Sequence, residues 1–293
     1  MSISSYSQLT PWASGAGVGP VIRGRRGDAA DAAAPLIHFL SGNGFCGGVY
    51  WPLLRRFLPQ YGLVTHDIEG QGDSGDPVHF SGVEAVLARI PQVMADLHLP
   101  GRPLIGMGHS FGGALTLRVA ADHPGLFKAL VLLDPIVMPP AVFAGIRLAS
   151  MLGRHPLANA SRRRRDTWPS RTALADHLRG RGTYKGWTEE AFQCFVEYAT
   201  HDQDGQRALS CPRELEAEIF ERPVWPWPAF RKARLPILLL RGEQSFPFFP
   251  RAERLAQRAN PQVVVRTLPG GHCFMQEHPD TAHAAIADFL ATL

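Results

Sequence analysis

Cysteine is scarce in this sequence, and the few that occur form no motif. The four cysteines lie at positions 46, 194, 211 and 273, so the chain contains no C-x-x-C pair. Zinc ribbons and thioredoxin-like redox sites need paired spacing, and we therefore expect neither a metal site nor a redox cofactor. Scattered cysteines are typical of reduced thiols in the cytoplasm.

Long hydrophobic runs are also missing. A membrane-spanning helix needs about 18 consecutive apolar residues, and no segment of the sequence approaches that length. The amino-terminal stretch MSISSYSQLTPWASGAG lacks the positively charged start and apolar run of a secretory signal. We therefore predict a cytoplasmic protein without a membrane span.

Charge is low and nearly balanced. Charged residues make up 19% of the 293 residues, hydrophobic residues 45%, and the net charge is +4, which is typical of a globular protein. No basic stripe is interleaved with aromatic residues, so the sequence predicts no nucleic-acid binding. One basic run, Arg162 to Arg165, is typical of a solvated surface; the alternative is attraction of an anionic substrate or partner.

What the sequence does contain is an alternation of short apolar runs and longer helical patterns. Such alternation is typical of a parallel sheet that helices cover on both faces. We therefore predict an α/β fold with a mostly parallel, twisted central sheet. The expected strands are Pro35–Leu40, Tyr61–Asp67, Pro103–Met107, Ala129–Leu133, Pro236–Leu240 and Gln262–Leu268. The expected helices are Val83–Leu97, a segment after Phe111, Arg251–Arg258 and a segment from Pro279.

The pattern changes between residues 134 and 228, where helical stretches and four of the six tryptophans occur without convincing parallel strands. We predict that residues 1–134 and 229–293 form the core domain and that residues 135–228 form a mainly helical cap or lid insertion. The glycine- and alanine-rich stretch from Gly24 to Ala34 is expected to be a surface turn between early strands.

A serine is crowded by glycines where a predicted strand gives way to a predicted helix. The residues Gly108-His109-Ser110-Phe111-Gly112 fit G-x-S-x-G, in which a strained turn presents a nucleophilic serine. Glycine is needed beside such a bend because larger side chains would clash. The amino-terminal end of the helix would also stabilise negative charge on a reacting carbonyl oxygen. We predict Ser110 as a nucleophile.

A serine hydroxyl is a poor nucleophile at neutral pH and needs a base. Among the 12 histidines, His272 follows the last predicted strand, in a loop at the same edge of the sheet as Ser110. His109 is too close to Ser110 along the chain to act as the base, and we expect it to pack or orient locally. We therefore predict His272 as the base.

These features resemble the α/β-hydrolase fold superfamily over nearly the whole chain. The segment from His66 to Ser74 is similar to the family's D-x-R-G-x-G-x-S loop, with Glu69 and Gln71 where Arg and His are usual. These departures concern the packing of the loop more than catalysis.

The loop from Ser41 to Phe45 resembles the family's H-G-x segment, with Ser41 in place of the histidine. In the family, that segment contributes a backbone N–H to the oxyanion hole. Because the donor is a backbone group, a change of side chain does not remove it. The resemblance implies oxyanion donors at the backbone N–H groups of Asn43 and Phe111, with Phe45 as the substitute for Asn43.

The carboxylate that orients the histidine is not where the family usually places it. The family's acid follows the seventh strand, a few residues past a glycine, and that position after Gly242 holds Ser245. Asp134 directly follows the strand that ends at Leu133, an arrangement similar to that of certain dehalogenases and lipases. Glu243 comes from the usual strand. We favour Asp134 as the acid and keep Glu243 as the alternative, because a histidine without a carboxylate loses control of its tautomer.

The sequence thus predicts a serine hydrolase that cleaves a carboxylic ester, lactone or thioester through an acyl-enzyme, without metal or organic cofactor. The aromatic residues favour a small-molecule substrate with an apolar or aromatic portion. Two alternatives stay open: cleavage of a carbon–carbon bond, and a catalytically slow or inactive ligand-binding or receptor protein. The sequence does not predict an oligomeric state.

Overall fold

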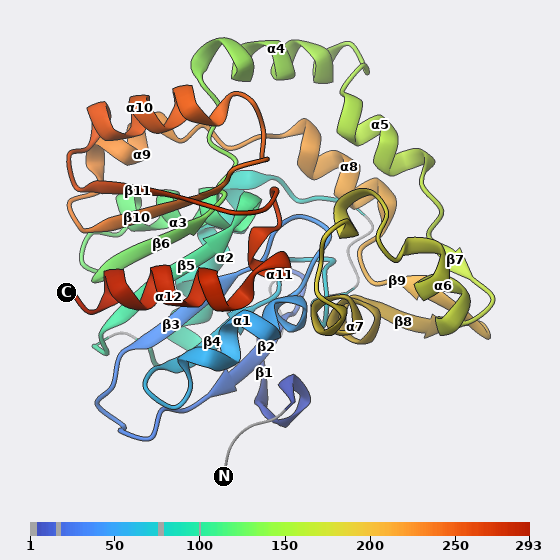
Figure 1. The fold of residues 1–293 in the computed structure, drawn as a ribbon, viewed down its shortest axis with the longest axis horizontal. Helices are drawn as coiled ribbons and strands as arrows, with labels where there is room; N and C mark the ends of the chain where they lie inside the picture. Colours follow the sequence, from blue (N-terminus) through green and yellow to red (C-terminus); the bar gives the residue numbers. More distant parts are fainter. Residues whose placement is uncertain (1–4, 16–18, 76–78, 100) are drawn as a thin grey trace.

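The centre of the computed structural model is an eight-stranded sheet with the order β1-β2-β4-β3-β5-β6-β10-β11 (Figure 1). The structure describes residues 5–15, 19–75, 79–99 and 101–293. The strands from β4 to β11 in that order are parallel, whereas β2 is antiparallel to β4 and to β1. The strands are β1 (Thr10–Ser14), β2 (Ile22–Gly27), β3 (Leu36–Leu40), β4 (Gly62–His66), β5 (Leu104–His109), β6 (Ala129–Leu133), β10 (Ile237–Gly242) and β11 (Val263–Leu268).

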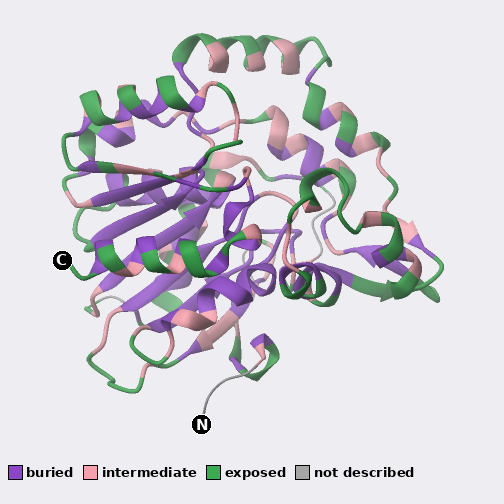
Figure 2. Ribbon diagram, in the orientation of Figure 1, coloured by how far each residue is buried: buried purple, intermediate pink, exposed green. Residues whose placement is uncertain are grey.

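The parallel strands are apolar on both faces because helices cover both faces. Every residue of β3, β4, β5 and β6 is buried (Figure 2). Successive side chains of a strand point to opposite faces. In β6, Val131 and Leu133 belong to the buried cluster that includes α1 and α12, whereas Leu130 and Leu132 belong to the cluster that includes α2, α3, α9 and α10. The helices are α1 (Trp51–Leu54), α2 (Val83–Asp96), α3 (Ser110–Asp122), α9 (Trp227–Lys232), α10 (Phe249–Ala259), α11 (Phe274–Glu277) and α12 (Pro279–Leu290).

The segment between β6 and α9 lies beyond the carboxyl edge of the sheet (Figure 1). Its helices are α4 (Pro140–Met151), α5 (Pro156–Arg163), α6 (Arg171–Leu178), α7 (Glu189–Tyr198) and α8 (Arg213–Glu221). It also contains a small antiparallel sheet that the sequence did not predict. Its strands are β7 (Thr167–Trp168), β9 (Gln206–Leu209) and β8 (Thr200–Gln203). Across the described ranges, no helix combines the length and the apolarity that crossing a bilayer requires.

The structure confirms the predicted α/β fold, with one local correction at the amino-terminal edge of the sheet. Residues 24–27 of the expected turn are the end of β2. Five of the six residues of this strand are arginine or glycine, so it lacks the apolar run that marks the inner strands. Gly24 is required there, because a Cβ atom at this position would lie 2.0 Å from the carbonyl oxygen of Thr65.

Candidate active site

The serine turn is as sharp as its glycines imply. Strand β5 ends at His109 and helix α3 begins at Ser110, whose φ of +51° lies in the strained left-handed region. A Cβ atom at Gly108 would approach the backbone of Gly112 to 2.6 Å. A Cβ atom at Gly112 would lie 2.4 Å from the carbonyl oxygens of Leu40 and Ser41. Both glycines are therefore needed for strand, turn and helix to pack this closely.

The structure brings Ser110, His272 and Asp134 together in a line. Nε2 of His272 lies 3.0 Å from Oγ of Ser110, and its Nδ1 lies 2.8 Å from Oδ1 of Asp134. These side chains come from β5–α3, from the loop after β11 and from the end of β6, which meet at the carboxyl edge of the sheet. His272 thus bridges the hydroxyl and the carboxylate.

Asp134 is fully buried and well supplied with hydrogen-bond donors. Its carboxylate accepts from the backbone N–H of Gly242 (2.8 Å) and from the hydroxyl of Ser245 (2.6 Å), in addition to His272. Ser245 occupies the position where the family's acid is usual, and here it holds the carboxylate that reaches in from β6. A buried carboxylate with three donors is satisfied and held in one orientation.

The alternative acid, Glu243, lies apart from the histidine. Glu243 is exposed, and its backbone N–H donates to the carbonyl oxygen of Leu268 (2.8 Å). Its side chain makes no hydrogen bond or ion pair with any residue that the structure describes. The geometry therefore favours Asp134 as the partner of His272.

A chain of hydrogen bonds that the sequence did not predict runs behind Ser110. The backbone N–H of Gly42 donates to the Tyr50 hydroxyl (3.1 Å), which lies 2.7 Å from Nδ1 of His109. Nε2 of His109 lies 3.0 Å from the carbonyl oxygen of His272. Burial lowers the pKa of His109 well below its ordinary value, so the ring is neutral. Because a carbonyl oxygen only accepts, Nε2 carries the proton, and Nδ1 accepts from Tyr50.

The predicted oxyanion loop lies at the same place. Asn43 and Phe111 both line the cavity beside Ser110. Phe111 is in the first turn of α3, where a backbone N–H has no acceptor within the helix. The N–H of Phe45 donates to the carbonyl oxygen of Gly42 (3.2 Å), so it is already engaged. This engagement favours Asn43 over its substitute Phe45.

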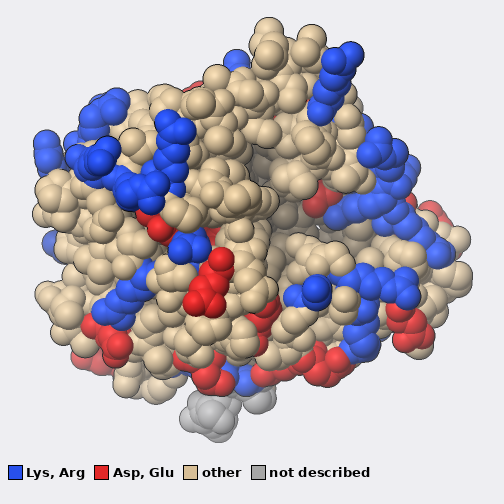
Figure 3. Space-filling model, turned by 45° about the horizontal axis from the view of Figure 1, so that its top comes forward, with Lys and Arg blue, Asp and Glu red and all other residues tan. Residues whose placement is uncertain are grey.

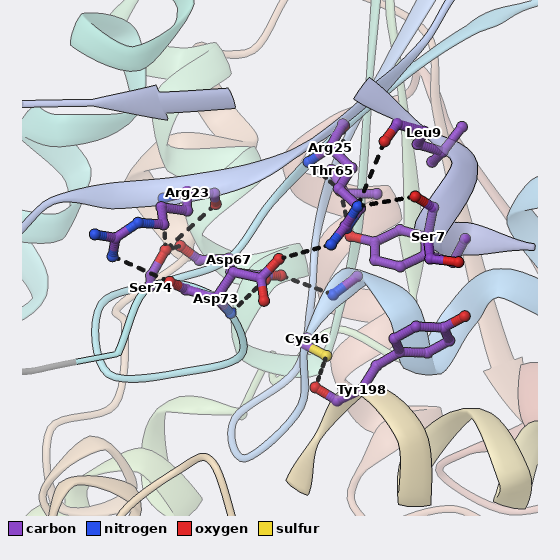
Figure 4. A network of polar contacts seen from close by, with 12 residues as sticks. Ser7, Leu9, Arg23, Arg25, Cys46, Thr65, Asp67, Asp73, Ser74 and Tyr198 are labelled. Carbon is purple, nitrogen blue, oxygen red and sulfur yellow. Dashed lines mark hydrogen bonds and ion pairs between the residues drawn. The ribbon is translucent and has the colours of Figure 1, made fainter. Parts of the chain in front are cut away.

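The loop from Asp67 to Ser74 contacts the oxyanion loop and the residues that follow it, and Figure 4 shows Asp67 and Asp73 near Cys46. The buried Asp67 carboxylate accepts from the backbone N–H groups of Gly47 (2.8 Å) and Asp73 (3.1 Å). The side-chain amide of Gln71 is oriented with its NH2 group toward carbonyl oxygens, and it donates to the carbonyl oxygen of Phe45 (2.8 Å). Gln71 thus contributes to loop packing, as its departure from the family pattern implied.

A cavity of about 590 Å³ opens beside the three residues. Its walls are mainly apolar and come from the oxyanion loop, from the segment between β6 and α9, including α4, α5, α7 and α8, and from the loop before α10. The lining side chains include Phe45, Val142, Ile146, Trp168, Tyr184, Phe195, Ile219 and Phe248.

The basic run is partly neutralised around this cavity. Arg164, on the cavity wall, pairs with the buried carboxylate of Glu216 (2.9 Å). Arg162 pairs with Glu214 (2.8 Å) and Glu221 (2.6 Å). These ion pairs tie the end of α5 to α8, a structural role that neither sequence interpretation of the run included.

A mostly parallel sheet with a serine turn at its carboxyl edge defines the α/β-hydrolase class of folds. The chain belongs to the alpha/beta hydrolase family, whose model matches residues 36–285. A solved alpha/beta hydrolase from Novosphingobium aromaticivorans shares this fold, with a TM-score of 0.77 and 22% identity over 98% of this chain and 99% of that one.

Two curated relatives are hydrolases. The chain is 35% identical over 103 residues to Type I acyl-CoA thioesterase mpaH of Penicillium roqueforti, a match that covers 34% of this chain and 22% of that protein. It is 25% identical to 2-(acetamidomethylene)succinate hydrolase of Mesorhizobium japonicum over 88% of each chain. The chain therefore spans less than a quarter of the length of the first curated relatives that it matches.

Proposed function

We propose that this protein is a serine hydrolase of carboxylic esters, with Ser110 as nucleophile, His272 as base and Asp134 as acid. The observation that carries the proposal is the position of the His272 ring, 3.0 Å from the Ser110 hydroxyl and 2.8 Å from the Asp134 carboxylate. Distances in this range suit proton transfer from a serine. Membership in a family with an acyl-CoA thioesterase and a 2-(acetamidomethylene)succinate hydrolase among the curated relatives supports hydrolysis as the reaction class.

The mechanism follows from these positions. Nε2 of His272 takes the hydroxyl proton of Ser110 while Oγ attacks the ester carbonyl carbon, and Asp134 stabilises the resulting imidazolium. The N–H groups of Asn43 and Phe111 donate to the oxyanion. The alcohol leaves with the proton from His272, and an acyl-enzyme forms. Water then gives a proton to His272 and attacks the acyl carbon. The bond to Oγ of Ser110 breaks, His272 returns its proton to that oxygen, and the carboxylic acid leaves. Lactones and thioesters react by the same steps.

The cavity indicates the kind of substrate. Its apolar and aromatic walls favour an apolar or aromatic acyl or alcohol group. In this proposal residues 135–228 act as the cap over residues 1–134 and 229–293, because α4 and α5 line the cavity opposite Ser110. The missing acid after the seventh strand gave weight to the ligand-binding alternative, and the position of Asp134 beside His272 supports the hydrolase instead.

Covalent labelling tests the nucleophile. A fluorophosphonate probe is expected to label the native chain, and p-nitrophenyl esters are expected to be hydrolysed. Ser110→Ala should abolish both labelling and turnover, whereas Ser7→Ala, which changes an exposed serine near the amino terminus, should retain both. A folded wild-type protein that is neither labelled nor active would contradict the proposal.

A further inference from the structure

Helix α4 exposes apolar side chains to water. Leu148, Met151 and Leu152 are 57%, 78% and 58% exposed, and no residue of α4 is buried. The helix stands at the top of the molecule, away from the central sheet (Figures 1 and 2). Isolated apolar residues on a surface are ordinary, but a cluster on one protruding helix is typical of an interaction surface.

The helix has two apolar faces with different surroundings. Val142 and Ile146, one turn apart, line the cavity beside Ser110. At 3.6 residues per turn, Leu148 and Met151 fall on the opposite side of the helix, and Leu152 follows Leu148 by one turn. Leu148, Met151 and Leu152 do not line the cavity, whereas Ala144 and Arg147 border a separate surface pocket that Pro223 and Trp225 also line.

The segment of chain that carries this outer face has charge of one sign, although Glu84 of α2 lines a surface pocket together with Arg147. Residues 135–165 contain six arginines and no aspartate or glutamate. Ion pairs engage Arg162 and Arg164. Four other arginines are exposed and have no acidic partner within the described part of the chain: Arg147, Arg154, Arg163 and Arg165. Figure 3 shows basic side chains beside a broad uncharged surface on the upper part of the molecule.

We propose that the outer face of α4, with its flanking arginines, docks on the surface of an anionic lipid bilayer. A bilayer offers both parts of the complement: an apolar phase for Leu148, Met151 and Leu152, and a dense negative charge for the arginines. A second copy of this chain fits less well, because a symmetric contact through this face would set arginines against arginines. Arg147 lies one turn from Met151, so charge and apolar contact act on the same side of the helix.

Docking in this position would place the cavity next to the lipid phase. The inner face of α4 lines the cavity while its outer face enters the headgroup region, so an ester dissolved in the bilayer would reach Ser110 past a single helix. This second step rests on the proposed function, whereas the docking itself does not.

Vesicle sedimentation of the full chain tests the docking. Wild-type protein is expected to sediment with phosphatidylcholine vesicles that contain phosphatidylglycerol, and to do so less with phosphatidylcholine alone or at high salt. The double variant Leu148→Ser/Met151→Ser should bind roughly tenfold more weakly, because the apolar contact is lost. Arg147→Gln/Arg154→Gln should lose about fivefold for each arginine.

A matched control and a second readout keep the outcomes distinct. Arg254→Gln/Arg258→Gln removes two exposed arginines from α10 and should bind vesicles as the wild type does. All variants should hydrolyse a water-soluble p-nitrophenyl ester at the wild-type rate, and only the α4 variants should slow on a long-chain ester presented in vesicles. Equal sedimentation of wild type and α4 variants would overturn the docking. So would an α4-dependent dimer that forms without lipid. Absence of soluble-ester turnover with normal sedimentation would overturn the proposed function alone.

Discussion

Nε2 of His109 lies 3.0 Å from the backbone carbonyl oxygen of His272. His109, the residue before Ser110, therefore holds the loop that carries His272. The other ring nitrogen of His109 accepts from Tyr50, whose oxygen accepts from the N–H of Gly42. One buried, neutral imidazole thereby connects the oxyanion loop, the serine turn and the loop of the base.

Breaking this chain should slow the chemical step and leave substrate binding nearly unchanged. Tyr50→Phe removes the hydroxyl that links Gly42 to His109, and we expect kcat to fall about ten- to hundredfold with little change in KM, because small displacements of catalytic groups are costly. His109→Gln keeps an N–H for the His272 carbonyl and should retain more activity than His109→Phe.

Steady-state kinetics on a p-nitrophenyl ester provides the measurement for this chain. Tyr61→Phe, which changes a half-buried tyrosine outside the hydrogen-bond chain, is the matched control. Equal kcat values for Tyr50→Phe and Tyr61→Phe would show that this chain of hydrogen bonds does not position the catalytic groups.

The acid can be identified by comparing three variants. Asp134→Asn should lower kcat by roughly 10⁴-fold, because the amide disfavours the tautomer that His272 needs as a base. Ser245→Ala removes one of the donors to Asp134 and should have a smaller effect, whereas Glu243→Gln should have almost none. A larger loss for Glu243→Gln than for Asp134→Asn would transfer the role to Glu243.

Gly42 has no room for a side chain. A Cβ atom there would lie 2.7 Å from Nδ1 of His109 and 3.2 Å from the Tyr50 hydroxyl. Gly42→Ala should lower the free energy of unfolding by about 1–3 kcal/mol through overpacking and should also reduce kcat. Gly145→Ala, in the open interior of α4, should stabilise the protein by about 0.5–1 kcal/mol. Urea denaturation of both variants measures the contrast, and equal shifts would refute the steric argument.

The buried Asp67 should make stability depend on pH. Burial raises the pKa of Asp67 from 3.8 to about 7. The folded chain therefore binds this proton more tightly than the unfolded chain does. The contribution of Asp67 to the free energy of unfolding is fully present below about pH 4 and is lost as the pH rises through about 7.

Asp67→Asn removes this titration. The free energy of unfolding of the wild type minus that of the variant should therefore decrease as the pH rises from about 5 to about 8. Denaturant titrations at both pH values provide the measurement, with the exposed Asp28→Asn as control. A difference between wild type and Asp67→Asn that does not change with pH would contradict the assignment.

Much of the fold could be predicted from the sequence because its main signals are local. A buried parallel strand such as Leu36–Leu40 must be apolar on both faces, and that requirement is visible in any short window. The glycines around Ser110 are equally local, since backbone contacts forbid a Cβ atom at positions 108 and 112. Strand β2, the second strand from the edge, escaped prediction because a strand with arginines and glycines carries no such signal.

What the sequence by itself determined is therefore the set of buried strands, the serine turn and the order of elements that brings a late histidine to the same edge. Only the tertiary structure decided which carboxylate reaches His272, how Tyr50 and His109 connect two loops, and which face of α4 looks outward. The physical reason is that these relationships depend on distances between residues far apart in the chain. A strand pattern places Asp134 and Glu243 at one edge, but packing alone directs one carboxylate to the imidazole and leaves the other in water.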